Sequence, residues 1–259
     1  MITIINNYRK NRLRQSLIIK KRTDVGIIVS VSAEGSILCR NLSNKTRTGA
    51  LYCEGSMIGK RVVLIVAGIG KVNAAHAATL LLHEFSPAVI MNIGIGGAYP
   101  LSGLKIGDVA IAEKEIYGDE GVLLKDDFHG IDFIGIPLLQ KGRKKYFNEF
   151  PLDMPLIRKA VKALSLSPLP LALKPGLFLT LSACTGTKKR ALELERCFGA
   201  ICENMEGAAV AHVCTLYGVP MIEMRGISNI VEDRDRSKWN IKLAAENCQN
   251  AALECIRAI

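Results

Sequence analysis

The chain has 259 residues and a formal net charge of +10, a charge that would suit a nucleic-acid-binding protein if it were spread over the whole surface. Seven of the 34 basic residues lie within residues 1–23, which contain no acidic residue, so the rest of the chain carries 27 basic and 24 acidic side chains. This length and near balance favour one α/β-sized domain that binds no nucleic acid, and no apolar run reaches the roughly 18 residues of a membrane span.

Residues 1–23 form a basic extension, which we interpret as a targeting segment, a nucleic-acid-binding arm or an over-extended start of the reading frame. Its apolar stretch Leu17-Ile18-Ile19 ends at Lys20 and is too short for a signal peptide. Among these interpretations we favour a dispensable extension that is poorly ordered or loosely packed. A single domain is then expected over residues 24–259.

The first half of this domain alternates apolar runs with a helical pattern. Short apolar runs predict buried strands at 25–31, 61–67 and 88–93, with a weaker candidate at 50–53. Small and apolar residues at a helical spacing predict a helix over 71–84. The residues expected on its packing face are Ala74, Ala75, Ala78, Leu81 and Leu82.

The second half follows the same alternation after an irregular region at 117–175, which holds Gly, Pro and basic clusters. The predicted strands are 108–112, 177–181 and a run from Met221, and the predicted helices are 187–197, one that starts near Glu206, and 237–259. The core residues expected from the last helix are Trp239, Leu243, Ala244 and Leu253. Alternating strands and helices predict an α/β fold, a single domain with a central, mostly parallel, twisted sheet flanked by helices.

The cysteines, histidines and glycine-rich segments indicate neither a metal nor a cofactor. Eight cysteines without a Cys-x-x-Cys pair are typical of reduced residues in a cytoplasmic protein, and the four histidines show no metal-ligand spacing. The glycine-rich segment 68–73 lacks the third glycine of a dinucleotide-binding loop. The segment 55–61 is one residue shorter than a P-loop and lacks the Ser/Thr after the lysine.

Polar and glycine-rich residues follow several predicted strands, at the ends where open α/β folds bind their ligands. Glu34 follows the first strand, and residues 68–70, 94–97 and 182–186 follow later ones. The glycines of 94–97 suit either a tight turn or a backbone with φ > 0 that approaches a ligand closely.

The apolar run from Met221 is unusual because it contains Glu223 and Arg225 and ends in Ser228-Asn229. Charge inside an apolar strand is costly unless it is paired or used. A structural ion pair at a sheet edge is one interpretation. We favour a ligand site at the carboxyl end of the strand.

Met205-Glu206, followed by Arg225-Gly-Ile-Ser-Asn229, resembles the motifs of the nucleoside phosphorylase and nucleosidase superfamily. With the continuation at 234–239, the pattern is most similar to the futalosine hydrolases of menaquinone biosynthesis, and the likeness extends from about residue 25 to the C-terminus. The resemblance implies a nucleoside phosphorylase-like fold, a small-molecule nucleoside substrate and a homo-oligomer, a dimer or higher.

The resemblance also implies roles for individual residues. Glu34 matches the acid that activates the attacking water, and Glu206 would grip two vicinal ribose hydroxyls and stabilise an oxocarbenium-like transition state. For each glutamate the alternative is an acid placed at a helix N-terminus. Arg225 would hold these glutamates and the water in place. The other residues expected at the substrate are Gly70, Ile95, Gly96, Cys184, Thr185 and Met205.

Asn229 bears most directly on which base is bound. Adenine-specific nucleosidases of the superfamily carry Asp here. An Asn amide donates to a 6-oxo group and accepts from N7–H, which suits hypoxanthine, the base of futalosine. Because Asn cannot act as a general acid, the proton for the leaving base is expected from solvent or from a neighbour such as Asp233 or Asp235.

Two further features bear on the reaction. Ile95 stands where a hydroxyl would help to bind phosphate, and no Gly-Asp-Pro-x-Arg-like loop follows the first strand, so water is favoured over phosphate. The run 234–238 is either a solvated helix start capped by Ser237 or a source of an arginine for a substrate carboxylate.

The sequence thus predicts an N-glycosyl hydrolase that cleaves futalosine to hypoxanthine and dehypoxanthine futalosine. The alternatives are a methylthioadenosine/adenosylhomocysteine nucleosidase, a purine nucleoside phosphorylase, and a non-catalytic nucleoside-binding or basic-armed interaction protein.

Overall fold

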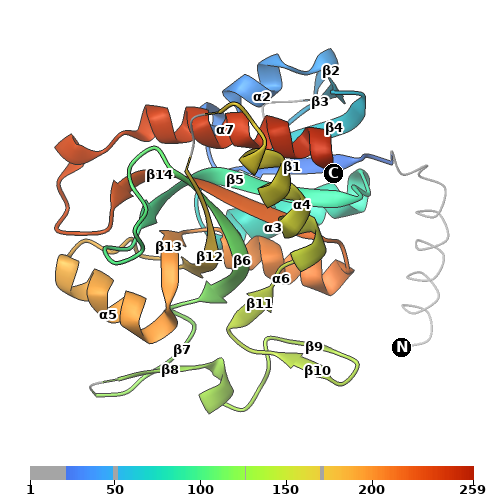
Figure 1. Cartoon of the computed structure of the whole chain (residues 1–259). Helices are drawn as coiled ribbons and strands as arrows, with labels where there is room; N and C mark the ends of the chain where they lie inside the picture. The colour runs from blue at the N-terminus through green and yellow to red at the C-terminus, as the bar shows by residue number, and fades with distance from the viewer. Residues whose placement is uncertain (1–21, 49–51, 126, 170–171) are drawn as a thin grey trace, which may run out of the picture.

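The computed structural model describes residues 22–48, 52–125, 127–169 and 172–259. Ten strands form its central sheet: β1 (Val25–Val29), β2 (Ser43–Thr48), β3 (Tyr52–Met57), β4 (Lys60–Val66), β5 (Val89–Ala98), β6 (Val109–Tyr117), β11 (Glu149–Pro151), β12 (Leu173–Thr180), β13 (Ala200–Asn204) and β14 (Met221–Ile230). The order is β11-β6-β12-β13-β5-β1-β4-β3-β2, and β14 pairs with both β5 and β6 (Figure 1).

Part of this sheet closes into a ring of strands. β14 runs parallel to β5 and antiparallel to β6, β6 and β13 both run parallel to β12, and β13 returns antiparallel to β5. In the resulting register both Glu203 of β13 and Asn229 of β14 lie opposite Gly97 of β5. The ring therefore brings residues that are far apart in the sequence to one point.

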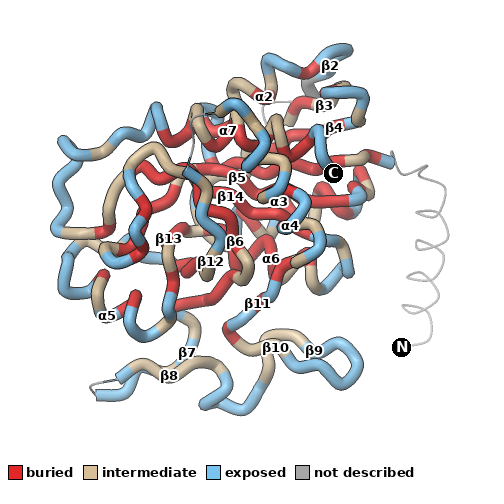
Figure 2. Tube along the Cα trace, viewed as in Figure 1, coloured by how far each residue is buried: buried red, intermediate tan, exposed pale blue. Residues whose placement is uncertain are grey.

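Two groups of helices cover the sheet. The helices are α2 (Ser36–Arg40), α3 (Lys71–Glu84), α4 (Met154–Ser165), α5 (Lys188–Phe198), α6 (Gly207–Tyr217) and α7 (Ile241–Ala258). α7 packs on β14 and β5 with α4 against it, and α3 packs against α6. The approach of α7 to β14 requires Gly226, because a Cβ there would overlap the carbonyl oxygen of Ala244. The central strands β1, β5, β6, β13 and β14 are almost entirely buried (Figure 2).

Two hairpins and three 3₁₀ turns complete the described elements. Two hairpins, β7 (Gly121–Leu123) with β8 (Phe128–Gly130) and β9 (Leu139–Lys141) with β10 (Lys144–Tyr146), project from the body (Figure 1). The 3₁₀ turns are η1 (Ser32–Glu34), η2 (Ile131–Phe133) and η3 (Arg236–Lys238).

The predicted α/β fold is confirmed, and the sheet is mixed because β13, β14 and the edge strands add antiparallel pairings. The helices predicted at 71–84 and 187–197 correspond to α3 and α5, and the strand candidate at 50–53 lies partly outside the described residues, with β3 starting at Tyr52. The irregular region contains a helix that we did not predict, α4. Its start is marked by Asp153, whose side chain accepts from the N–H of Leu156.

The prediction for the last helix is partly wrong. α7 begins at Ile241 and is capped by Asn240, so Ser237 is not its cap and Trp239 precedes it. Ala244 is buried as expected, but Leu243 is 37% exposed and Trp239 is only half-buried. The buried face of α7 runs through Ala244, Cys248 and Ala252, which leaves Leu243 at its margin in the first turn of the helix.

Residues 1–21 of the predicted extension lie outside the described residues. Thr23 is already part of the fold: its N–H donates to the carbonyl of Phe85 and its carbonyl accepts from Ala88. Within the described ranges, no helix has the length and apolar character of a membrane span, and no three His, Cys, Asp or Glu side chains gather as metal ligands.

Candidate active site

A cavity of about 290 Å³ lies at the carboxyl ends of β1, β5, β13 and β14. Its walls hold nine of the ten residues predicted from the sequence: Glu34, Ile95, Gly96, Cys184, Thr185, Met205, Glu206, Arg225 and Asn229. Gly70 is not among the residues that line the cavity. It acts through Glu206, because its N–H donates to Oε1 of Glu206 at 3.0 Å.

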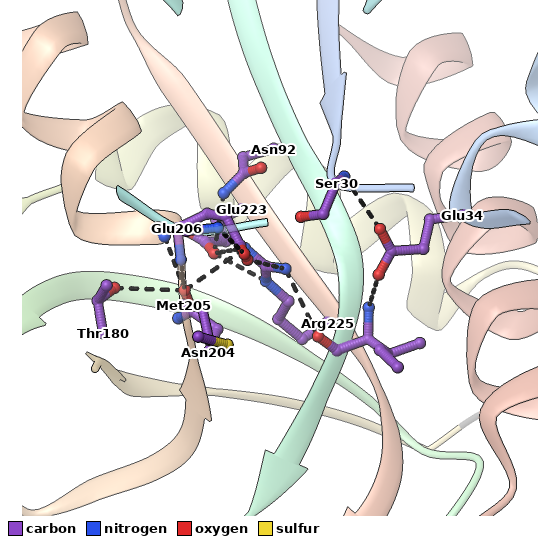
Figure 3. Close-up of polar contacts among 12 residues, drawn as sticks. Ser30, Glu34, Asn92, Thr180, Asn204, Met205, Glu206, Glu223 and Arg225 are labelled. Atoms are coloured by element: carbon purple, nitrogen blue, oxygen red, sulfur yellow. Dashed lines mark hydrogen bonds and ion pairs between the residues drawn. The ribbon is translucent and has the colours of Figure 1, made fainter. Parts of the chain in front are cut away.

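Glu34 is held by backbone groups of two strands. Its Oε2 accepts from the N–H groups of Ser30 and Val31 at 3.0 and 3.1 Å, just beyond β1, and its Oε1 accepts from the N–H of Ile95 at 2.9 Å (Figure 3). Burial raises the pKa of Glu34, although Arg225 and these N–H donors lower it. The result is a fixed carboxylate that takes up a proton more readily than an exposed glutamate does.

Glu206 stands at the N-cap of α6, yet its side chain does not cap the helix. The amide oxygen of Asn204 accepts from the N–H groups of Glu206 and Gly207, and the hydroxyl of Thr180 accepts from the N–H of Ala208. These two side chains satisfy the helix start, so the carboxylate of Glu206 can face the cavity. This geometry disfavours the interpretation of Glu206 as a helix-capping acid.

Arg225 is 1% exposed and is surrounded by carboxylates. Its Nε and Nη2 donate to Oε1 of Glu223 at 2.9 and 2.8 Å, and its Nη1 lies 3.3 Å from Oε2 of Glu206. Burial alone would lower the pKa of Arg225, but Glu223, Glu206 and Glu34 together raise it above its usual value. Arg225 therefore stays cationic and fixes the orientation of Glu206 (Figure 3).

The glycines at 94–97 allow neighbouring side chains to pack closely against β5, and they do not adopt an unusual backbone conformation. They lie within β5, and none of them has the positive φ that we considered. A Cβ on Gly94 would lie 2.7 Å from Oε1 of Glu34 and 2.8 Å from Nη1 of Arg225. A Cβ on Gly96 would lie 2.6 Å from the sulfur of Cys202. The expectation of a turn is wrong, because missing side chains rather than a bend make room for the site.

Asn229 presents its amide to the cavity with a defined orientation. Its Oδ1 accepts from the hydroxyl of Ser228 at 2.8 Å, and its Nδ2 donates to the carbonyl of Ile230 at 3.1 Å. The opposite orientation would place Oδ1 against the Ile230 carbonyl, acceptor against acceptor. One N–H and one lone pair of the amide remain for a ligand.

Glu203 is a cavity residue that the sequence analysis did not select. Its Oε1 accepts from the N–H of Thr185 at 3.0 Å and its Oε2 from the hydroxyl of Tyr99 at 3.1 Å, and burial raises its pKa. The sequence signal for Glu203 was a charged residue near the end of the apolar strand β13. A charged residue in an apolar strand is also what identified Arg225 in β14. The lining residues Gly97, Ser228 and Arg234 belong to segments that the sequence had marked as ligand-site candidates, and Trp239 had been expected in the core. The lining residues that the sequence did not indicate are Ser30, Val31, Ile69 and Asn204.

The charged run at 234–238 contributes one arginine to the cavity. The guanidinium of Arg234 lies 4.8 Å from the centroid of the Trp239 ring, and both side chains line the wall. No carboxylate of the described residues lies within ion-pair distance of Arg234. Asp233 and Asp235 are exposed and do not line the cavity. The expectation that either aspartate protonates the leaving base has no geometric support.

A cavity at strand ends with three hydrogen-bonded carboxylates, a buried arginine and an oriented side-chain amide suits a sugar linked to a heterocycle. Residues 24–257 match the family model of the Phosphorylase superfamily, and the chain therefore belongs to that superfamily. The predicted family is confirmed.

Relatives of two kinds support this assignment. The chain is 35% identical to the futalosine hydrolase of Thermus thermophilus over 212 residues, which are 78% of this chain and 88% of that protein. It is 32% identical to the 5′-methylthioadenosine/S-adenosylhomocysteine nucleosidase of Halalkalibacterium halodurans over 240 residues, 90% of this chain and 98% of that protein. By their names both are hydrolytic enzymes, and the predicted class, an enzyme acting on nucleosides, is confirmed.

A solved structure extends the comparison to the fold. The Neisseria meningitidis 5′-methylthioadenosine/S-adenosylhomocysteine nucleosidase, in complex with methylthio-immucillin-A, superposes with a TM-score of 0.78 at 26% identity. The match covers 92% of this chain and 100% of that structure. The nucleoside phosphorylase-like fold expected from the resemblance is thus confirmed.

Proposed function

We propose that this protein hydrolyses the N-glycosidic bond of futalosine, releasing hypoxanthine and dehypoxanthine futalosine in menaquinone biosynthesis. The observation that carries the proposal is the oriented amide of Asn229 in the wall of the cavity. Its remaining N–H suits the O6 of a 6-oxopurine and its remaining lone pair suits N7–H. A 6-aminopurine would place a donor against that N–H.

In the proposed reaction the C1′–N9 bond breaks and its electron pair leaves with the purine. The ribose then carries oxocarbenium-like charge, which the carboxylate of Glu206 stabilises while it accepts from the two vicinal hydroxyls. Water forms the new bond to C1′ and passes a proton to Glu34. Arg225 keeps Glu206 in place, the N–H groups of Ser30, Val31 and Ile95 keep Glu34 in place, and the purine takes its proton at N7 from solvent.

Glu203 adds a second contact to the base in this proposal. Glu203 and Asn229 lie opposite Gly97 on its two neighbouring strands, so their side chains flank one point of the cavity. A Cβ on Gly97 would lie 3.3 Å from Nδ2 of Asn229 and 3.6 Å from Cγ of Glu203. Hypoxanthine presents N1–H beside O6, and a carboxylate accepts from N1–H. Adenine has only an acceptor at N1, which a carboxylate repels.

Arg234 and Trp239 support a substrate with a carboxylated aromatic substituent. Futalosine carries a benzoate group, whose ring can pack on Trp239 and whose carboxylate can pair with Arg234. Methylthioadenosine carries an uncharged substituent and would leave Arg234 without a partner.

The second candidate is a methylthioadenosine/adenosylhomocysteine nucleosidase. It is favoured by the relatives that cover nine-tenths of this chain, such as the enzyme of Halalkalibacterium halodurans. Phosphorolysis has weaker support, because the cavity wall holds Ile95 where a phosphate-binding hydroxyl would be expected. A non-catalytic nucleoside-binding protein would not need the fixed carboxylate of Glu34.

The base-reading claim is tested with Asn229→Asp. One unmade buried polar pair costs about 1–3 kcal/mol, or about 5- to 150-fold in kcat/KM. The unaltered protein should prefer futalosine over its 6-amino analogue by at least that range, and Asn229→Asp should narrow or reverse the preference.

The matched control for this test is Asn247→Asp. The amide of Asn247 donates to the carbonyl of Gly107 outside the cavity, so this change should leave the preference unaltered. Equal discrimination before and after Asn229→Asp would show that Asn229 does not read the base.

We also infer that the protein works in the cytoplasm as a homo-oligomer, a dimer or higher. Apolar side chains near the cavity are exposed in the single chain, with Ile69 59% and Val72 83% exposed, and a second subunit would cover them. Analytical ultracentrifugation should show a dimer or a larger species, and a monomer at micromolar concentration would contradict this inference.

A further inference from the structure

Behind Arg225, on the side away from the cavity, lies a pair of fully buried glutamates, Glu115 of β6 and Glu223 of β14. Both side chains are 0% exposed. Glu223 holds Arg225 through Oε1, which also accepts from Nδ2 of Asn92 at 3.1 Å. Its other oxygen, Oε2, is the one buried side-chain oxygen or nitrogen of the described residues that has no hydrogen-bond partner.

Glu115 has the opposite arrangement, with two donors and no cation. Its Oε2 accepts from the hydroxyl of Thr180 at 2.7 Å and its Oε1 accepts from Nδ2 of Asn204 at 2.8 Å. Among the described residues, no Lys, Arg or His side chain forms an ion pair with Glu115. An ionised carboxylate in this position would be a buried charge without a counterion, which costs several kcal/mol.

The two carboxyl groups meet at Gly207. A Cβ on Gly207 would overlap both Oε1 of Glu115 and Oε2 of Glu223. The unpartnered oxygen of Glu223 therefore faces an oxygen of Glu115 in a space that no side chain fills. Two ionised oxygens in this space would repel each other, whereas a single proton between them makes a hydrogen bond.

We propose that Glu115 carries this proton and donates it to Oε2 of Glu223, and that it is thereby a positioning residue for Arg225. Burial raises the pKa of Glu115 well above its usual value, which agrees with the geometry. Both oxygens of Glu223 then have a partner, so Glu223 stays ionised and pairs with Arg225. Arg225 in turn stays beside Glu206. Asn204 links the buried glutamate pair to Glu206, because its Nδ2 donates to Glu115 and its Oδ1 accepts from the N–H of Glu206.

The proton itself is tested by infrared spectroscopy, without any substrate. At neutral pH the difference spectrum between the unaltered protein and Glu115→Gln should contain the C=O stretch of a carboxylic acid, shifted by D₂O. If Glu115→Gln fails to fold, the difference against Glu115→Leu serves instead, since that change also removes the carboxylic acid. A difference spectrum without a carboxylic-acid band would overturn the proposal.

The positioning role is tested by kinetics and rests on the proposed nucleosidase function. Glu115→Gln keeps a donor toward Glu223, at the cost of one contact in which its NH₂ faces Nδ2 of Asn204, and should retain kcat within about tenfold. Glu115→Leu keeps the volume without a donor and should lower kcat by about 100-fold, the cost expected when a catalytic group is displaced by 1 Å. Equal losses in both variants would overturn the positioning role.

Glu195 provides the matched control. It is a buried glutamate of α5 that accepts from the N–H of Leu101, outside the cavity. Glu195→Gln should leave the carboxylic-acid band and kcat unchanged. If futalosine is not the substrate, the unaltered protein does not cleave it, but the infrared band of Glu115 is still present. Failure of the proposed function is therefore distinguishable from failure of the proposal about Glu115.

Discussion

Replacing Glu34 by glutamine separates its chemical role from its structural one. Glutamine keeps the shape of the side chain but has one acceptor oxygen where glutamate has two. The carboxylate of Glu34 accepts from three N–H groups, two at Oε2 and one at Oε1. The glutamine carbonyl is expected to accept from the N–H groups of Ser30 and Val31. The glutamine NH₂ then faces the N–H of Ile95, donor against donor.

This mispaired contact gives the structural cost of the change. Leaving one buried N–H unsatisfied costs about 1–3 kcal/mol of stability, which a folded domain of this size tolerates. The chemical cost is larger, because the variant cannot take the proton from water. Removing a positioned base lowers turnover by about 10²–10⁴-fold. The control Glu195→Gln should lose stability without losing turnover, because its carboxylate accepts from the N–H of Leu101 outside the cavity.

The pH dependence of kcat/KM gives an independent assay of the same residue. Only the ionised form of Glu34 accepts a proton, so activity falls as the pH drops below the pKa of Glu34. Because burial raises that pKa, the acid limb should lie above the usual range of glutamate, and Glu34→Gln should abolish it. A folded variant with near-normal turnover, or one with the same acid limb, would remove Glu34 from the mechanism.

Three other changes test neighbouring parts of the account. Glu206→Gln should lower turnover by about 10²-fold or more, and 2′-deoxy substrates should be poor for the unaltered protein, because the vicinal hydroxyls are the proposed partners of this carboxylate; equal cleavage of ribo and deoxy substrates would contradict that role. Gly94→Ala should lower kcat by at least about tenfold, since its Cβ would displace Glu34 or Arg225, while Gly186→Ala, whose Cβ would meet nothing within 4 Å, should be neutral. Deleting residues 1–21, which leaves the buried Thr23 in place, should preserve activity and reduce any salt-dependent binding to DNA; a folded but inactive truncation would show that the extension is needed.

The convergence of the catalytic candidates was predictable from the sequence. Glu34, Arg225 and Asn229 stand out as polar residues in or just after apolar strands, and α/β folds bring such strand ends to one edge. The pairing of β13 with β5 was not predictable, because it joins segments about a hundred residues apart through backbone groups. Without that pairing, nothing in the local pattern places Glu203 beside Asn229.

Local chemistry misled the prediction in two places. Glycines at 94–97 suggested a turn, but their missing side chains make room for Glu34 and Arg225 beside an extended strand. The partnership of Glu115 and Glu223 was also hidden, since a buried acid pair leaves no spacing signal when its members lie on strands β6 and β14. Glu223 was visible inside its apolar run, but Glu115 lies beyond the strand predicted at 108–112, and the space at Gly207 that joins the two side chains left no signal in the sequence.

The most direct test of the proposed function is to incubate the protein with futalosine, methylthioadenosine and inosine, each with and without phosphate, and to identify the base and the sugar released. The account predicts that futalosine is the preferred substrate by kcat/KM. It also predicts that hypoxanthine and dehypoxanthine futalosine form at a rate that does not depend on phosphate. Faster release of adenine from methylthioadenosine, a sugar phosphate formed only with phosphate, or no cleavage of any substrate would contradict it.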